Sequence, residues 1–209
     1  MRLKVLWRPL SHSRRVQLRG YLIIIPEQTS SIIPSQMSSE RSQSTFVSVR
    51  EERKWNKLSE HMSAFHEHFK VEFNTLYELA DGSFTRRGLS LPRYLDTAES
   101  MNHHLTMHHT IEERYIFPIL AKKMPQFANN DDGPHIASHH GIHEGLAQLE
   151  TLVQGWKQAP STYSPTAMRA CLDSFRAVLF RHLDEEVTDL RGENLKKYLT
   201  LEELESLPM

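Results

Sequence analysis

The feature that most constrains this chain is a pair of acidic side chains on helix faces that otherwise look like core. His108 and Glu112 lie four residues apart, and His182 and Glu186 repeat the spacing. Residues four apart share one face of an α-helix, and the neighbouring positions on both faces are mostly apolar. Burying a carboxylate is costly unless something neutralises its charge. The fold must therefore bring these glutamates together with a cationic partner.

The apolar residues mostly recur every three or four positions, which predicts an all-α fold. We expect four long helices, over about residues 51–80, 91–124, 134–158 and 165–190, separated by Gly- or Pro-containing loops. On the second helix, Tyr115 and Ile119 are expected to face the core. Short loops join antiparallel neighbours, so the helices should form an up-down-up-down four-helix bundle. A ferritin-like bundle would need a long crossover connection and Glu-x-x-His pairs, and the sequence has neither.

The predicted bundle occupies residues 51–192, between two segments of different character. Residues 1–50 carry eight basic and two acidic residues and are expected to form a disordered extension. This segment has the composition of a mitochondrial transit peptide, and an over-extended gene model that should start at Met37 is the alternative. Residues 193–209 are expected to form a tail with a short helix over about residues 195–207.

Charge and cysteine content narrow the possible environments and partners. Residues 51–209 carry 17 basic and 24 acidic residues, so no nucleic-acid partner is expected. No apolar run approaches the roughly 18 residues needed to span a bilayer, so no membrane partner is expected either. The single cysteine, Cys171, excludes an intrachain disulfide and fits a reducing compartment. We expect a cytoplasmic protein, with a mitochondrial location as the alternative.

Seven histidine and glutamate side chains fall on the inward stripes, and every long helix contributes at least one. They are His66, His108, Glu112, His139, His143, His182 and Glu186. A metal-free network would have to satisfy every one of these groups, and its only cations would be protonated histidines. We therefore predict a metal centre.

The donor set indicates which metal the centre holds. Seven nitrogen and oxygen ligands without a thiolate are too many for one ion and suit two. Imidazole with carboxylate favours iron, manganese or zinc over calcium or magnesium. If both carboxylates bridge the ions and an oxo or hydroxo group adds a further bridge, one coordination position stays open. Such a position would suit O2 or a peroxide.

Four segments, HHTIEERYIFP, HHGIHEGL, FRHLDEEVTDL and FHEHFKVEFNTLYELA, occur in an order and spacing that resemble the hemerythrin-like, or HHE cation-binding, family. The resemblance covers about residues 55–190 and is strongest with fungal members. It implies a centre of two iron ions, with zinc or manganese less favoured. By this resemblance one iron is bound by His139, His143 and His182, the other by His66 and His108, and the two are bridged by Glu112 and Glu186.

Two features leave alternatives open. His109 and Glu113 form a second pair four residues apart and would replace His108 and Glu112 if the helical register were shifted. Otherwise Glu113 is expected to be an outer hydrogen-bond acceptor for a ligating imidazole, or a surface charge. Oxygen-carrying hemerythrins have an aspartate five residues after the last histidine ligand, where this chain has Val187. This difference argues against simple reversible O2 transport.

The resemblance implies a non-heme di-iron protein that binds O2 or a related small ligand, in sensing, storage or detoxification. The alternatives are a di-iron oxygenase or oxidase that acts on an organic substrate, and a bundle that binds zinc or a single ion.

Overall fold

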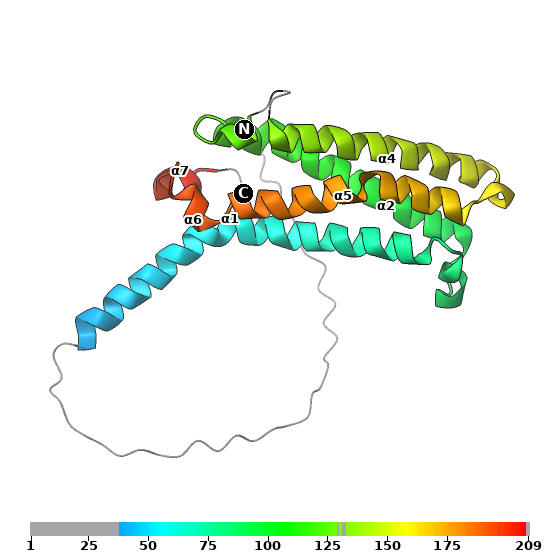
Figure 1. Ribbon diagram of the computed structural model, residues 1–209. Coiled ribbons are helices and arrows are strands. Elements are labelled where there is room, and N and C mark those ends of the chain that lie inside the picture. The colour runs from blue at the N-terminus through cyan, green and yellow to red at the C-terminus, as the bar shows by residue number, and fades with distance from the viewer. Residues whose placement is uncertain (1–37, 129, 131–132, 208–209) are drawn as a thin grey trace, which may run out of the picture. The chain divides into compact units, whose positions relative to one another are not determined.

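The computed structural model describes residues 38–128, 130 and 133–207, and within them all regular structure is helical (Figure 1). This confirms the all-α class. Four long helices make the bundle: α1 (Ser38–Leu79), α2 (Leu91–Ile111), α4 (Pro134–Gln158) and α5 (Pro165–Asp189). Successive long helices run in opposite directions, as the short loops predicted (Figure 1).

Helix α1 begins at Ser38, well before the expected start at Glu51. Residues 38–50, which were assigned to the extension, are therefore helical, and the rest of that segment, residues 1–37, lies outside the described residues. No helix in the described part of the chain is both long and apolar enough to cross a bilayer.

The helix ends follow local sequence signals. Gly82 and Gly88 flank the 3-10 helix η1 (Ser83–Arg87), and both adopt a positive φ, of 92° and 74°, which glycine reaches at little cost. A serine caps α5: the Ser164 side chain accepts a hydrogen bond from the Ala167 backbone N–H at 3.2 Å. Short 3-10 turns, η3 (Pro125–Phe127) and η4 (Pro160–Thr162), complete the other connections.

The apolar interior is divided into two clusters along the bundle. The larger cluster includes Phe73, Leu76, Tyr94, Met101, Leu149 and Phe175. The smaller cluster includes Trp55, Phe117, Met124, Phe127, Leu190 and Leu204. The buried histidines and glutamates lie between them: on α1, for example, His66 follows Met62 of the smaller cluster and precedes Phe69 of the larger. The bundle therefore holds a polar layer with apolar packing on both sides.

The helical register changes after Ile111, where a π-helical turn η2 (Glu112–Ile116) joins α2 to α3 (Phe117–Leu120). A π turn contains about one residue more than an α turn, so the inward positions move along by one residue. Ile116 is buried where Tyr115 was expected, and Tyr115 and Ile119 are 58% and 36% exposed. The inward placement of Tyr115 and Ile119 was wrong for this reason.

The C-terminal segment forms two short helices, α6 (Gly192–Leu195) and α7 (Leu201–Glu205), instead of the single helix expected there. A capping box between Thr200 and Glu203 starts α7. Leu204 is buried in the smaller cluster, so this segment covers one end of the bundle core.

Candidate metal centre

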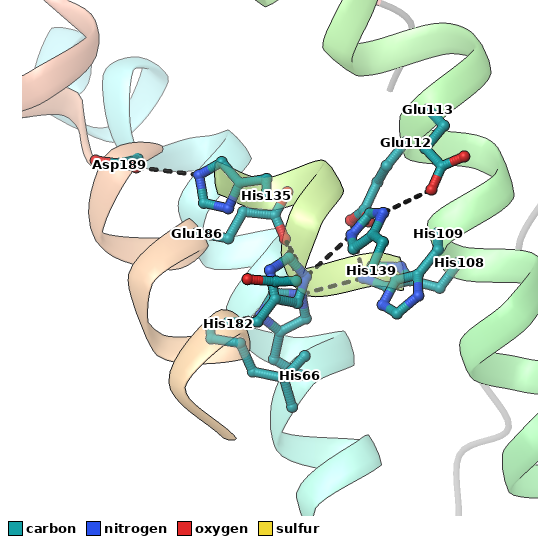
Figure 2. A network of polar contacts seen from close by, with 12 residues as sticks. His66, His108, His109, Glu112, Glu113, His135, His139, His182, Glu186 and Asp189 are labelled. Carbon is teal, nitrogen blue, oxygen red and sulfur yellow. Dashed lines mark hydrogen bonds and ion pairs between the residues drawn. The ribbon is translucent and has the colours of Figure 1, made fainter. Parts of the chain in front are cut away.

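The polar layer is built from all four long helices and η2 (Figure 2). Seven of its side chains make two overlapping groups of four, and in each group the possible ligand atoms lie within 4.8 Å of one another. The α4 quartet consists of His109, Glu112, His139 and His182; the α1 quartet consists of His66, His108, Glu112 and Glu186. All are buried except His108, whose side chain is 12% exposed. Glu112 belongs to both quartets.

The spacing of the imidazole nitrogens fits a metal ion. The Nε2 atoms of His66 and His108 are 3.0 Å apart, and those of His139 and His182 are 3.1 Å apart. Two ligand nitrogens at a right angle around a metal, each bonded at about 2.1 Å, are separated by about 3.0 Å. Each quartet therefore holds a pair of imidazoles at the distance of neighbouring ligands.

Outer hydrogen bonds orient two of these rings. His66 Nδ1 donates to the backbone carbonyl of Leu183 at 2.8 Å, and His139 Nδ1 donates to Glu113 Oε1 at 2.8 Å. The Nε2 atoms then carry the lone pairs and point into the polar layer, as ligating imidazoles do. Glu113 thus has the outer acceptor role that the sequence predicted for it.

The two buried carboxylates have no hydrogen-bond donor for any of their four oxygens within the described protein. Imidazole nitrogens face them instead. Glu112 Oε1 is 2.9 Å from His108 Nε2, and Glu186 Oε2 is 3.5 Å from His66 Nε2. Unsatisfied buried carboxylates of this kind fit a bound cation, which would neutralise the charge and use the free oxygens as ligands.

Burial sets the protonation states of the layer. It raises the pKa of Glu112 well above its ordinary value, with Glu113 as a second cause, and raises that of Glu186 similarly, with Glu112 adding to it. It lowers the pKa of His66 to about 3, helped by the charge of His108, and that of His108 to about 4. Without a metal, burial therefore favours the neutral form of both the imidazoles and the carboxyls, and a bound cation would displace protons from the carboxyls.

The resemblance makes His143 a ligand and leaves His109 as an alternative, but in the structure it is His109 that belongs to a quartet. His143 is half-buried and lies outside both quartets, with its Nε2 3.3 Å from His109 Nδ1. His109 is fully buried, stacks on the His139 ring at 3.8 Å between centroids, and has no partner for Nε2. The assignment of His143 as a ligand stays a prediction. The adjacent histidines in HHTIEE were the sequence signal for His109, but they did not reveal that both rings would face the layer.

His135 is a further buried histidine next to the layer. Its Nε2 lies 3.1 Å from Asp189 Oδ2, and its ring centroid is 5.6 Å from that of His182. The sequence pattern did not predict it as a site residue.

Comparisons with known proteins agree with this architecture. The chain is 37% identical over 93 residues to the "Dimeric xanthone biosynthesis cluster protein R11" of Cryptosporiopsis sp. (strain 8999). That alignment covers 44% of this chain and 32% of the relative, so the chain matches about a third of the relative's length. No solved structure matches significantly.

A family model described as the hemerythrin HHE cation binding domain matches residues 57–190. The matched region runs from α1 to the end of α5 and contains both quartets. It covers well over half of the chain, and the buried histidines and glutamates form a cluster that could hold a cation, in keeping with the family description. The chain therefore belongs to the hemerythrin HHE cation-binding family.

Proposed function

We propose that the two quartets hold two iron ions and that this centre binds O2 or a related small ligand. The observation that carries the proposal is the overlap of the quartets at Glu112. Two separate ions would need separate ligand sets, whereas two adjacent ions share bridging carboxylates. The overlap is the arrangement expected for an adjacent pair.

Both glutamates are placed to bridge. Glu112 turns one oxygen toward each quartet: Oε1 is 2.9 Å from His108 Nε2, and Oε2 is 3.5 Å from His139 Nε2. Glu186 Oε2 lies 3.5 Å from His66 Nε2 and 3.6 Å from His182 Nε2, and these rings belong to different quartets. Each carboxylate therefore faces both proposed ion positions.

The ligand set supports iron, because imidazole with carboxylate and no thiolate suits iron, manganese or zinc. The family resemblance favours iron among these. Iron would supply redox activity and an open position for a small ligand. The protein supplies seven donors, fixes two ring orientations through Leu183 and Glu113, and excludes bulk water with apolar clusters on both sides.

The close packing around His108 supports a small ligand. His108 is the only quartet member that is not fully buried, and its ring lies against Phe69 and Phe65, at 5.0 and 6.0 Å between centroids. O2 and similar molecules would need far less room to pass these rings than an organic substrate. We place this activity in a reducing compartment, in keeping with the single cysteine, and favour the cytoplasm.

The test uses protein that is stripped with a chelator and reloaded with ferrous iron without oxygen. On exposure to O2 we expect a long-lived visible absorption band from the oxygenated centre. Immediate irreversible oxidation to a ferric product would favour an oxygenase or a ferroxidase, and no spectral change would contradict both.

The second candidate is a di-iron oxygenase or oxidase that acts on an organic substrate. Its support is the relative, whose name places it in a xanthone biosynthesis cluster. A surface cavity of about 280 Å³ adds to this support, because it is lined by His135, Asp184 and Asp189 and His135 contacts the His182 ring. Substrate-dependent consumption of O2 by the reloaded protein would favour this candidate over the first.

A further inference from the structure

A second group of potential ligands lies outside the buried layer. It consists of His68 and Glu72 on α1 and His104 on α2, and their possible ligand atoms lie within 4.8 Å of one another. We propose that these three side chains form a solvent-accessible site for one divalent transition-metal ion. We call it the surface site.

The geometry of the surface site is convergent. Glu72 Oε1 is 3.3 Å from His68 Nε2 and 3.2 Å from His104 Nδ1. The two imidazoles thus approach the same carboxylate oxygen from different helices, and their ring centroids are 6.3 Å apart. A cation bound among these atoms would be coordinated by two nitrogens and one oxygen, all on the same side of the ion.

Two neighbouring helices position the three donor side chains. His68 and Glu72 are four residues apart and share a face of α1, while His104 extends across from the neighbouring helix. The Glu72 side chain is only 15% exposed, whereas those of His68 and His104 are 60% and 47% exposed. The half-enclosed carboxylate therefore anchors a site whose open side faces water.

The donor chemistry selects the class of cation. Two imidazoles with one carboxylate suit Zn2+, Co2+, Ni2+ or Fe2+, whereas Ca2+ and Mg2+ prefer oxygen ligands. Three protein ligands leave the remaining positions to water, so the surface site should bind and release its ion readily. The buried quartets, which supply more donors and exclude water, should hold their ions far more tightly.

The surface site shares no residue with either quartet, so it does not depend on the proposed function. It lies close to the buried centre all the same, because His104 is four residues, about one helical turn, before His108. An ion at the surface site would sit beside the quartet member that is not fully buried.

The experiment is a calorimetric titration of the full chain with Zn2+, without an affinity tag and with its firmly bound metal left in place. Wild-type protein should take up one more Zn2+ per chain than the His104→Ala variant, or bind that ion at least about tenfold more tightly. Glu72→Gln should lose the same step, because it keeps the shape of the side chain but removes its charge. His103→Ala is the matched control, since this exposed neighbour lies outside the cluster.

Two further measurements test whether the loss of Zn2+ binding is specific to the surface site. All variants should keep wild-type helicity by circular dichroism and, after gel filtration, wild-type content of firmly bound metal, because the changed residues lie outside the quartets. Identical Zn2+ isotherms for wild type and His104→Ala would overturn the proposal. An equal loss in the His103→Ala control would also overturn it.

Discussion

At the scale of single residues, Glu112 and Glu186 explain why a polar layer can exist inside this bundle. Both carboxylates are fully buried or nearly so, and none of their oxygens has a hydrogen-bond donor within the described protein. Such groups destabilise a fold unless a cation compensates for their lost hydration. The layer is therefore expected to be destabilising when empty and stabilising when metal is bound.

Two single substitutions test which histidine completes the α4 quartet. The family resemblance assigns this role to His143, whereas the structure places His109 with Glu112 and His139. We expect His109→Ala to reduce the iron content from two ions per chain toward one. We expect His143→Ala to keep both ions but to weaken binding by about 10- to 100-fold, as loss of an outer hydrogen-bond partner does.

Elemental analysis after gel filtration, together with a chelator competition assay, measures both effects. His140→Ala is the control, because this histidine is exposed on the same helix as His143. If His143→Ala loses an ion while His109→Ala keeps both, the assignment from the resemblance is correct and His109 is the outer partner.

At the scale of helices, α4 and α5 pack closely because of one glycine. A Cβ atom on Gly145 would lie 2.3 Å from Cδ1 of Phe175, whose ring is buried and has little room to move. Gly145→Ala should therefore lower the free energy of unfolding by about 1–3 kcal/mol, the usual cost of overpacking a core. The gain in helix propensity offsets only part of this loss.

Gly155 is the matched control on the same helix. A Cβ atom there meets nothing within 4 Å, so Gly155→Ala should raise the free energy of unfolding by up to about 1 kcal/mol. Urea denaturation followed by circular dichroism measures both variants. Equal stability of the two would contradict the close approach of α4 to α5.

The long helices could be predicted from the sequence, but one irregular turn within them could not. The period of the apolar residues located the four long helices, and pairs such as His182 and Glu186 identified the polar layer. The π turn at Glu112–Ile116 was missed, because apolar or aromatic residues occupy both the regular period, at Tyr115 and Ile119, and the period shifted by one residue, at Ile116 and Leu120. That turn accounts for the misplaced Tyr115, since a regular α-helical period was assumed there.

At the scale of the whole molecule, the buried imidazoles should make the metal-free protein sensitive to acid. Burial lowers the pKa of His66 to about 3 and of His108 to about 4, both from 6.5. Between pH 6.5 and about 4 the unfolded chain therefore binds more protons than the folded chain. Each such histidine then lowers the free energy of unfolding by up to about 1.4 kcal/mol for every unit that the pH falls.

Glu112 and Glu186 act in the opposite direction. Their raised pKa values make the folded state keep protons that the unfolded state loses above about pH 4.5, so they lower stability as the pH rises. The buried histidines outnumber them, and we expect a net loss of stability on acidification. Urea unfolding of chelator-treated protein at pH 7.5, 6.5 and 5.5 measures this, and a constant free energy across the series would contradict it.

We propose above all that one bundle holds two iron ions side by side. The most direct test is a metal count on protein purified from iron-replete cells, by elemental analysis against an accurate protein concentration. We expect two iron ions per chain. One ion or none per chain, or zinc in place of iron, would contradict it.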